Sequence, residues 1–179
     1  MATDGTSRSF ALNIRSLAVL GAAAVVLALP MLIYGPMLHG YDTREHLSYS
    51  RHFSGQFWAG EWYPRWLIGI HHGLGSPSLF VYPPLPTYVD ALLEPVARLF
   101  HYYAFRMGEY LALFVSGICA FLWLSTMAKK RIALVGAVLY MLLPYHLALD
   151  YYRKSALAEC WALAWVPLRP PWSCLSCET

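Results

Sequence analysis

The stretch "LAVLGAAAVVLALPMLIYGPML", residues 17–38, is apolar throughout and carries no charged side chain. A helix rises about 1.5 Å per residue, so this run is long enough to cross a hydrocarbon core of about 30 Å. Arg8 and Arg15 precede it, as basic residues precede the apolar part of a signal peptide. Because the run is long for a signal peptide and "PMLHGYDT" is a poor cleavage site, we expect an uncleaved transmembrane helix, kinked near Pro30.

The composition of the whole chain indicates the same class of protein. Of its 179 residues, 58% are hydrophobic and 13% are charged, and the mean hydropathy is +0.44. Soluble domains carry charge on about a quarter of their residues. The net charge of +3 is small and the Lys and Arg residues are scattered, so we expect membrane lipids and no nucleic acid as partners.

Three more apolar runs follow along the chain. Two are long, Tyr103–Met127 and Ile132–Leu149, and the basic segment "AKKR" (residues 128–131) separates them. The third begins near Ala156 and is short. We therefore predict an all-α polytopic membrane protein with about three complete transmembrane helices and a truncated fourth. The predicted parts are a cytoplasmic amino terminus (1–16), a membrane module (17–167) and an aberrant or disordered tail (168–179).

The segment Pro84–Phe100 decides the topology. Its apolar residues recur at helical spacing, while Asp90, Glu94 and Arg98 fall together on one face of the same helix. This amphipathic pattern favours a helix that lies along the membrane surface over one that crosses the membrane.

The distribution of basic residues agrees with a surface helix. Cytoplasmic loops are enriched in Lys and Arg, which places the amino terminus and residues 128–131 in the cytoplasm. Both fall on that side only if Pro84–Phe100 does not cross the membrane. Residues of about 39–102 then form a long external loop with interfacial helices, and "DYYRKSALAE" (150–159) lies on the same outer side.

The segment "GYDTREHLSYSRHF" opens the external loop with an acidic residue, Asp42. One interpretation is structural: Asp42 caps a helix and Glu45, three residues on, completes a capping box. The other is functional: Asp42 stands at the mouth of the first span, with His46 one turn further on the same face. There the carboxylate acts as a general base or binds a cation, with the imidazole as its partner.

Two further segments carry cations beside aromatic or acidic residues. In "YPRW", Arg65 is either an ordinary headgroup anchor or a phosphate-binding residue assisted by the backbone amides of "GLGSP". In "YYRKSALAE", Arg153 and Glu159 either anchor the ends of two spans or form a site. A site is indicated because an ionisable residue inside an apolar run is costly, and Arg153 can pair with Glu159 or with an anionic ligand.

The four cysteines give little chemistry. Cys119 and Cys160 lie in apolar runs and are expected to be buried thiols. Cys174 and Cys177 form a C-x-x-C motif, but no second pair completes a zinc site.

Taken in order, "YDTREH", "YPRW", "GLGSPSLFVYPPLPTY", "LPYH" and "YYRKSALAE" resemble a bacterial membrane-protein family labelled "6-pyruvoyl-tetrahydropterin synthase-related". The layout resembles the amino-terminal module of GT-C glycosyltransferases, and the resemblance covers about Leu17–Pro167. It implies a multi-pass protein of the bacterial inner membrane, with a cytoplasmic amino terminus, that transfers sugar from a polyprenyl-phosphate donor at the outer leaflet.

The resemblance also implies roles for individual residues. Asp42 takes the role of the catalytic or metal-binding acid, the metal being a divalent cation. The other implied catalytic residues are His46 and Glu159, and the implied substrate-binding residues are Arg65, Arg153 and Tyr82.

GT-C enzymes have more spans than this sequence contains, so the resemblance makes the chain a fragment that is inactive by itself. Two alternatives stay open. The chain is a non-catalytic or transport-type membrane protein, which charges inside the membrane would serve equally well, or it is an inactive remnant.

Overall fold

The computed structural model describes residues 12–34 and 42–168. These residues are mainly helical and contain no β-strand, only an isolated bridge between Leu67 and Ser76. The elements in chain order are α1 (Ile14–Tyr34), α2 (Thr43–Trp58), η1 (His71–Gly73), η2 (Ser78–Phe80), α3 (Leu85–Leu99), α4 (Ala104–Met127), α5 (Lys130–Met141), the π-helix η3 (Tyr145–Lys154), α6 (Leu157–Trp165) and η4 (Val166–Leu168). The all-helical fold class is therefore confirmed for the described residues.

Three stretches in this part of the chain are long and apolar enough to cross a membrane: Ile14–Met31, Ala104–Met127 and Lys130–Lys154. They correspond to the three complete spans predicted from the sequence. The last one differs from the prediction because η3 continues it to Lys154, beyond Leu149. Leu157–Leu168 is a shorter apolar helix. The predictions for residues 1–11 and for the tail with Cys174 and Cys177 lie outside the described residues.

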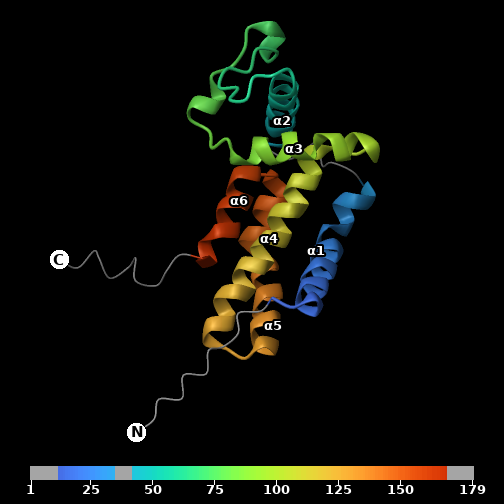
Figure 1. Ribbon diagram of the computed structural model, residues 1–179, viewed down its shortest axis with the longest axis vertical. Coiled ribbons are helices and arrows are strands. Elements are labelled where there is room, and N and C mark those ends of the chain that lie inside the picture. Colours follow the sequence, from blue (N-terminus) through green and yellow to red (C-terminus); the bar gives the residue numbers. More distant parts are fainter. Residues whose placement is uncertain (1–11, 35–41, 169–179) are drawn as a thin grey trace, which may run out of the picture.

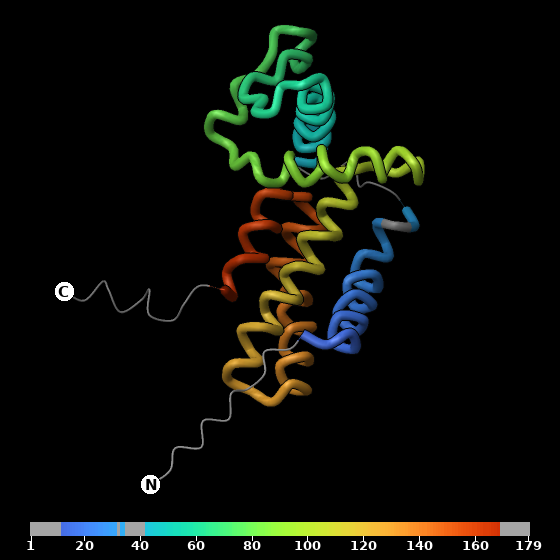
Figure 2. The backbone as a smooth tube through the Cα atoms, in the orientation of Figure 1, coloured from blue at the N-terminus to red at the C-terminus, as the bar shows by residue number. Residues whose placement is uncertain are grey.

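The apolar helices form a bundle with α4 at its centre (Figures 1 and 2). α4 packs against α1, α5 and α6, and small residues let the helices approach one another. Gly117 on α4 lies against Met141 and Leu20, and Gly136 on α5 lies against Leu124. The buried alanines of this core are Ala24, Ala28, Ala120, Ala133 and Ala137.

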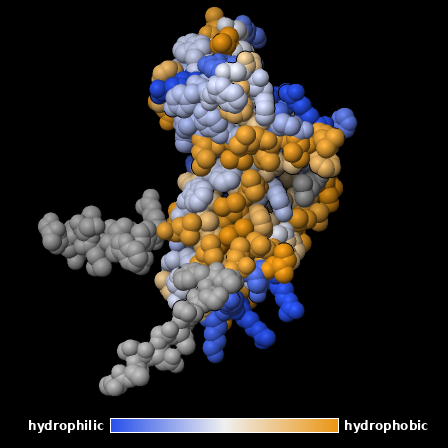
Figure 3. All heavy atoms as spheres, in the orientation of Figure 1, coloured by the Kyte–Doolittle hydropathy of each residue, from blue (hydrophilic) through white to orange (hydrophobic). Residues whose placement is uncertain are grey.

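The two ends of the bundle differ. At one end, which we call the basic end, α4 turns into α5 through residues 128–131. At the other, which we call the cap end, α3 lies across the bundle and α2 stands above it (Figure 1). Figure 3 shows hydrophobic residues over the flank of the bundle and hydrophilic residues at both ends. This distribution is the one expected of a protein whose middle lies in a bilayer.

The residues between α2 and α3 fold around a small core of their own. Phe53 and Phe57 on α2 pack with Leu67, Ile70 and Leu79, and all five are buried. Trp58 Nε1 donates a hydrogen bond to the Ala91 carbonyl of α3, at 2.9 Å. Gln56 binds both Trp66 and Ile68 through its side-chain amide. These contacts fix the segment on top of α3.

The spacing of Asp90, Glu94 and Arg98 predicts one polar face on α3, but Asp90 does not lie on an exposed surface. Asp90 is fully buried, whereas Glu94 and Arg98 form an ion pair of 3.0 Å whose arginine is exposed. Asp90 turns inward because α3 packs on α4 at Gly108, where the absence of a side chain leaves room for its carboxyl group. The position of α3 along a membrane surface stays a prediction.

Candidate functional site

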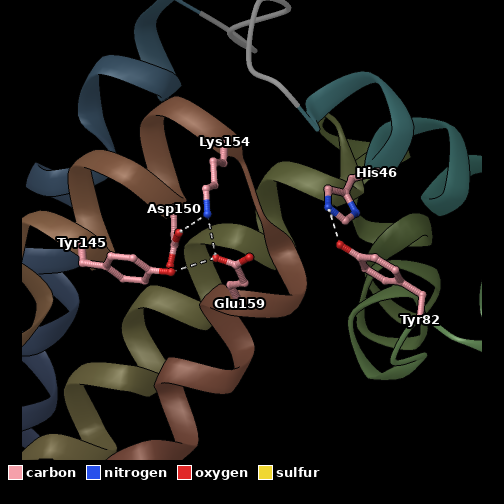
Figure 4. Close-up of polar contacts among 6 residues, drawn as sticks. All are labelled: His46, Tyr82, Tyr145, Asp150, Lys154 and Glu159. Atoms are coloured by element: carbon pink, nitrogen blue, oxygen red, sulfur yellow. Dashed lines mark hydrogen bonds and ion pairs between the residues drawn. The ribbon is translucent and has the colours of Figure 1, made fainter.

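A cluster of charged residues lies where η3 gives way to α6 at the cap end (Figure 4). Lys154 Nζ donates to Glu159 Oε2 at 3.2 Å and lies 3.6 Å from Asp150 Oδ1. The Tyr145 hydroxyl donates to the same glutamate oxygen at 3.4 Å. The chain reverses at Ser155, which has a positive φ of 54°, so that residues nine apart in sequence face one another. We call these four residues, Tyr145, Asp150, Lys154 and Glu159, the acid–lysine cluster.

His46 and Tyr82 lie across from the acid–lysine cluster (Figure 4). A hydrogen bond of 3.3 Å joins the Tyr82 hydroxyl and His46 Nε2, and His46 also stacks on Phe105 of α4. Burial lowers the pKa of His46, against the opposing effect of Asp42, Glu45 and Glu159, so the imidazole is neutral at pH 7. Burial raises the pKa of Tyr82, and the negative charges of Asp42 and Glu159 add to this effect.

Asp42 connects the two groups through its backbone. Its N–H donates to the Lys154 carbonyl at 3.2 Å, which ties the start of α2 to the end of η3. Asp42 occupies the N-cap position of α2, but its side chain makes no capping hydrogen bond. The expected capping box is therefore not formed, and the half-buried carboxylate is not used to satisfy the helix terminus. Residues from distant parts of the sequence thus meet at the cap end.

The two arginines predicted to bind substrate lie apart from this arrangement or at its margin. Arg65 sits over the rings of Phe80, at 4.2 Å, and Tyr63, at 5.5 Å, within the segment between α2 and α3. Arg153 is exposed near the end of η3, beside the acid–lysine cluster in sequence. Tyr82, the third predicted substrate-binding residue, directly contacts the predicted catalytic residue His46 through its hydroxyl group.

The backbone amides of "GLGSP" do not form the phosphate-binding loop considered above. The N–H groups of Gly73 and Gly75 both donate to the Ile70 carbonyl, and that of Ser76 donates to Leu67. Gly75 has a φ of 81° and packs against the Trp66 indole. The glycines therefore serve the local turn, and its amides are already used within it.

Sequence reasoning missed a second polar group, buried at the start of α4. Arg106 Nη1 donates to Glu109 Oε2 at 2.5 Å, and the Ser155 hydroxyl lies 3.5 Å away. Arg106 is 4% exposed and Glu109 is fully buried. The signal was present in the sequence: an arginine and a glutamate three residues apart inside an apolar run are costly and by default indicate a site.

Asp90 extends this buried group from α3. Burial raises the pKa of Asp90 to about 8, and the nearby charges of Glu109 and Glu94 act in the same direction. The Ser50 hydroxyl opposes the shift but does not cancel it. Asp90 is therefore a neutral carboxylic acid at pH 7, packed against Gly108.

The geometry gives no support for a metal centre. Among residues 12–34 and 42–168, no three His, Cys, Asp or Glu side chains are placed so that they could hold a metal ion. Binding of a divalent cation by Asp42 stays a prediction from the resemblance.

The fold and the polar groups define an all-helical protein with three helices that are long and apolar enough to cross a membrane, compatible with an integral membrane protein. Comparison of the chain with known protein families, with curated proteins and with solved structures found no match.

Proposed function

We propose that this chain is the membrane module of a GT-C-like glycosyltransferase, which uses a polyprenyl-phosphate-linked sugar donor at the outer leaflet of a bacterial inner membrane. The observation that carries the proposal is the meeting of Asp42, His46 and Glu159 with Lys154 at the cap end. These residues come from α2, η3 and α6, so the arrangement exists only in the folded chain.

The chemistry of sugar transfer needs a base and a cation at such a place. The acceptor hydroxyl attacks the anomeric carbon, the new C–O bond forms, and the bond from that carbon to the phosphate oxygen breaks. A carboxylate takes the hydroxyl proton, and the polyprenyl phosphate leaves with the bonding electron pair. Asp42 supplies the base, since its side chain is not engaged by the helix terminus. Lys154 and Arg153 add positive charge beside the reacting groups.

Neutral His46 and Tyr82 are suited to positioning. Their hydrogen bond joins α2 to the segment that leads into α3, and the Phe105 ring stacks on the imidazole. A neutral imidazole can accept or donate a hydrogen bond without adding charge near the donor phosphate. Tyr82 then orients the sugar or the acceptor through its hydroxyl group.

The test is a transfer assay on a complete GT-C-like enzyme that contains this module, purified and placed in nanodiscs, because the module is expected to be inactive by itself. A panel of polyprenyl-phosphate monosaccharides with radiolabelled sugars is offered together with a lipid and glycan extract as acceptor. We expect label to move from one donor to an acceptor, transfer to be lost in Asp42→Asn, and transfer to persist in Glu45→Gln. Glu45 is the matched control because it is an exposed carboxylate in the same helical turn. Absence of transfer from every donor refutes the proposal.

A non-catalytic transport-type protein is the second candidate, favoured by the ionisable residues buried at the cap end, Asp90, Arg106 and Glu109. It predicts movement of a polyprenyl-phosphate sugar between the leaflets of a vesicle with no change in its chemistry. The same panel of donors in sealed vesicles separates the two candidates.

A further inference from the structure

A groove lies between α1, α3 and α4. Its volume is 470 Å³, within the range of about 300–1,000 Å³ that ligand pockets have. Tyr102 and Arg106 line it at the cap end, where Leu93 of α3 joins them. Farther along, α1 contributes Val25, and α4 contributes Met107, Tyr110 and Leu111. The groove is therefore apolar along its length, with the side chains of Tyr102 and Arg106 at one end.

Arg106 presents an unused hydrogen-bonding edge in the wall of this groove. Its Nη1 holds Glu109 and lies near Ser155 and the Met31 sulfur. Its Nε and Nη2 are buried and have no hydrogen-bond partner among the described residues. These two nitrogens form the side-on edge of a guanidinium group, which binds two oxygens of a phosphate or carboxylate at once. Leaving such donors without a partner is costly, which indicates that a ligand supplies the oxygens.

The start of α4 adds to the attraction for an anion. Arg106 is the third residue of this helix, whose 24 residues align their peptide dipoles with the positive end at the cap end. Glu109 offsets one unit of charge, but it binds Nη1 and leaves the Nε–Nη2 edge without a partner among the described residues. The Tyr102 hydroxyl lies at the same end of the groove and can donate to a further oxygen.

We propose that this groove binds the polyprenyl phosphate itself, with the phosphate on the Nε–Nη2 edge of Arg106 and the chain lying along Val25, Tyr110 and Leu111 toward the middle of the bundle. The ligand class rests on the proposed function; the location and the role of Arg106 do not. Arg106 is thereby the lipid-phosphate-binding residue, in place of the Arg65 that the sequence suggested.

The experiment uses photo-crosslinking of the full chain in phosphatidylcholine nanodiscs. The probe is a polyprenyl phosphate with a diazirine on its chain, and the comparison probes carry an alcohol or a carboxylate in place of the phosphate. We expect the phosphate probe to label the α1 peptide that contains Val25 and the α4 peptide that contains residues 107–111. Equal labelling by the alcohol overturns the role of Arg106, and stronger labelling by the carboxylate overturns the ligand class.

Variants on both sides of the ion pair sharpen the test. Arg106→Gln is expected to weaken phosphate binding about tenfold or more, because a charge-assisted bidentate contact is lost. Glu109→Gln is expected to strengthen it, since a competing negative charge is removed; a purely structural ion pair would weaken binding in both variants.

A second pair of variants leaves the ion pair untouched and so stays informative if the first pair misfolds. Val25→Trp fills the groove and is expected to abolish labelling at both peptides. Val26→Trp is its matched control, because Val26 is 65% exposed and does not line the groove. Undiminished labelling in Val25→Trp, or labelling confined to the acid–lysine cluster, overturns the proposal.

The outcomes also separate this inference from the proposed function. Labelling in the groove without sugar transfer supports the proposed binding site and refutes the proposed enzymatic function. Sugar transfer that depends on Asp42, without labelling in the groove, refutes the proposed binding site and supports the proposed enzymatic function.

Discussion

Replacing Asp90 by asparagine should change how the stability of the protein depends on pH. The substitution keeps the shape of the side chain and removes its ability to ionise. In the folded protein burial raises the pKa of Asp90 from 3.8 to about 8, whereas in the unfolded chain the pKa returns to its ordinary value. Between these two values the folded state holds a proton that the unfolded state has lost. Stability conferred by that proton therefore falls as the pH rises from about 4 to about 8, and is constant above this window.

The magnitude follows from the slope of this linkage. Each pH unit inside the window costs about 1.4 kcal/mol, so the wild type loses about 3 kcal/mol between about pH 5 and about pH 7 relative to Asp90→Asn. Other titrating groups contribute equally to both proteins and cancel in the difference. Denaturant unfolding in mild-detergent micelles, followed by the fluorescence of the seven tryptophans, measures it.

Glu94→Gln is the control for this experiment. Glu94 lies on the same helix, but it is partly exposed and pairs with the exposed Arg98. Surface pairs of this kind contribute at most about 1 kcal/mol, so its removal should leave the pH dependence nearly unchanged. If the stability difference between Asp90→Asn and the wild type is the same at both pH values, Asp90 is not a buried neutral acid and the reasoning fails.

Three further predictions concern the packing, the ion pair and the topology. Gly108→Ala places a methyl group against the Asp90 carboxyl and should destabilise the protein by about 1–3 kcal/mol in the same unfolding assay. Its control is Gly55→Ala in α2, where the added methyl group meets nothing within 4 Å and the change should be neutral or slightly stabilising. The double replacement Arg106→Met with Glu109→Leu should leave the free energy of unfolding unchanged or raise it, since it removes both partners of a buried ion pair. Glu109→Leu alone should lower that free energy by about 3–5 kcal/mol, because it leaves a buried charge unpaired. An equal loss of stability in both variants would contradict this prediction. A cysteine in place of Lys129 should react with a membrane-impermeant maleimide only after the cell is opened, and reaction in intact cells would reverse the predicted orientation.

The spans were predictable because their signal is long and local. Twenty or more apolar residues without charge have one favourable structure in a bilayer, so α1 and α4 begin within a few residues of the predicted positions. The π-helix η3 was not predicted. Its ten residues follow Pro144, which cannot donate a backbone hydrogen bond, and the pattern from Tyr145 to Lys154 is consistent with either an α- or a π-helix.

The candidate site was only partly predictable, for a different reason. Asp42, His46 and Glu159 were selected by type and position, but their mutual placement depends on how α2 and η3 meet, which no local pattern encodes. Asp90 was misassigned because periodicity identifies which residues share a face without identifying which neighbour covers that face. Here the neighbour is Gly108, and only tertiary contact shows that it leaves room for a carboxyl group.

The location of the charged residues argues that the cap end is where the protein acts. Residues 16–34, 110–128 and 132–149 contain no Asp, Glu, Lys or Arg, so the middle of each of the three long apolar stretches is free of charge. The buried or half-buried Asp, Glu, Lys and Arg side chains of α3, α4 and η3 all lie within a few turns of the cap end: Asp90, Glu94, Arg106, Glu109, Asp150 and Lys154. Apolar residues of similar size would fill the same volume without the desolvation cost of charges, so packing alone does not account for these residues. Binding of a phosphate at Arg106 and transfer of a sugar near Asp42 would explain why charged residues occur both at the start of α4 and in the acid–lysine cluster.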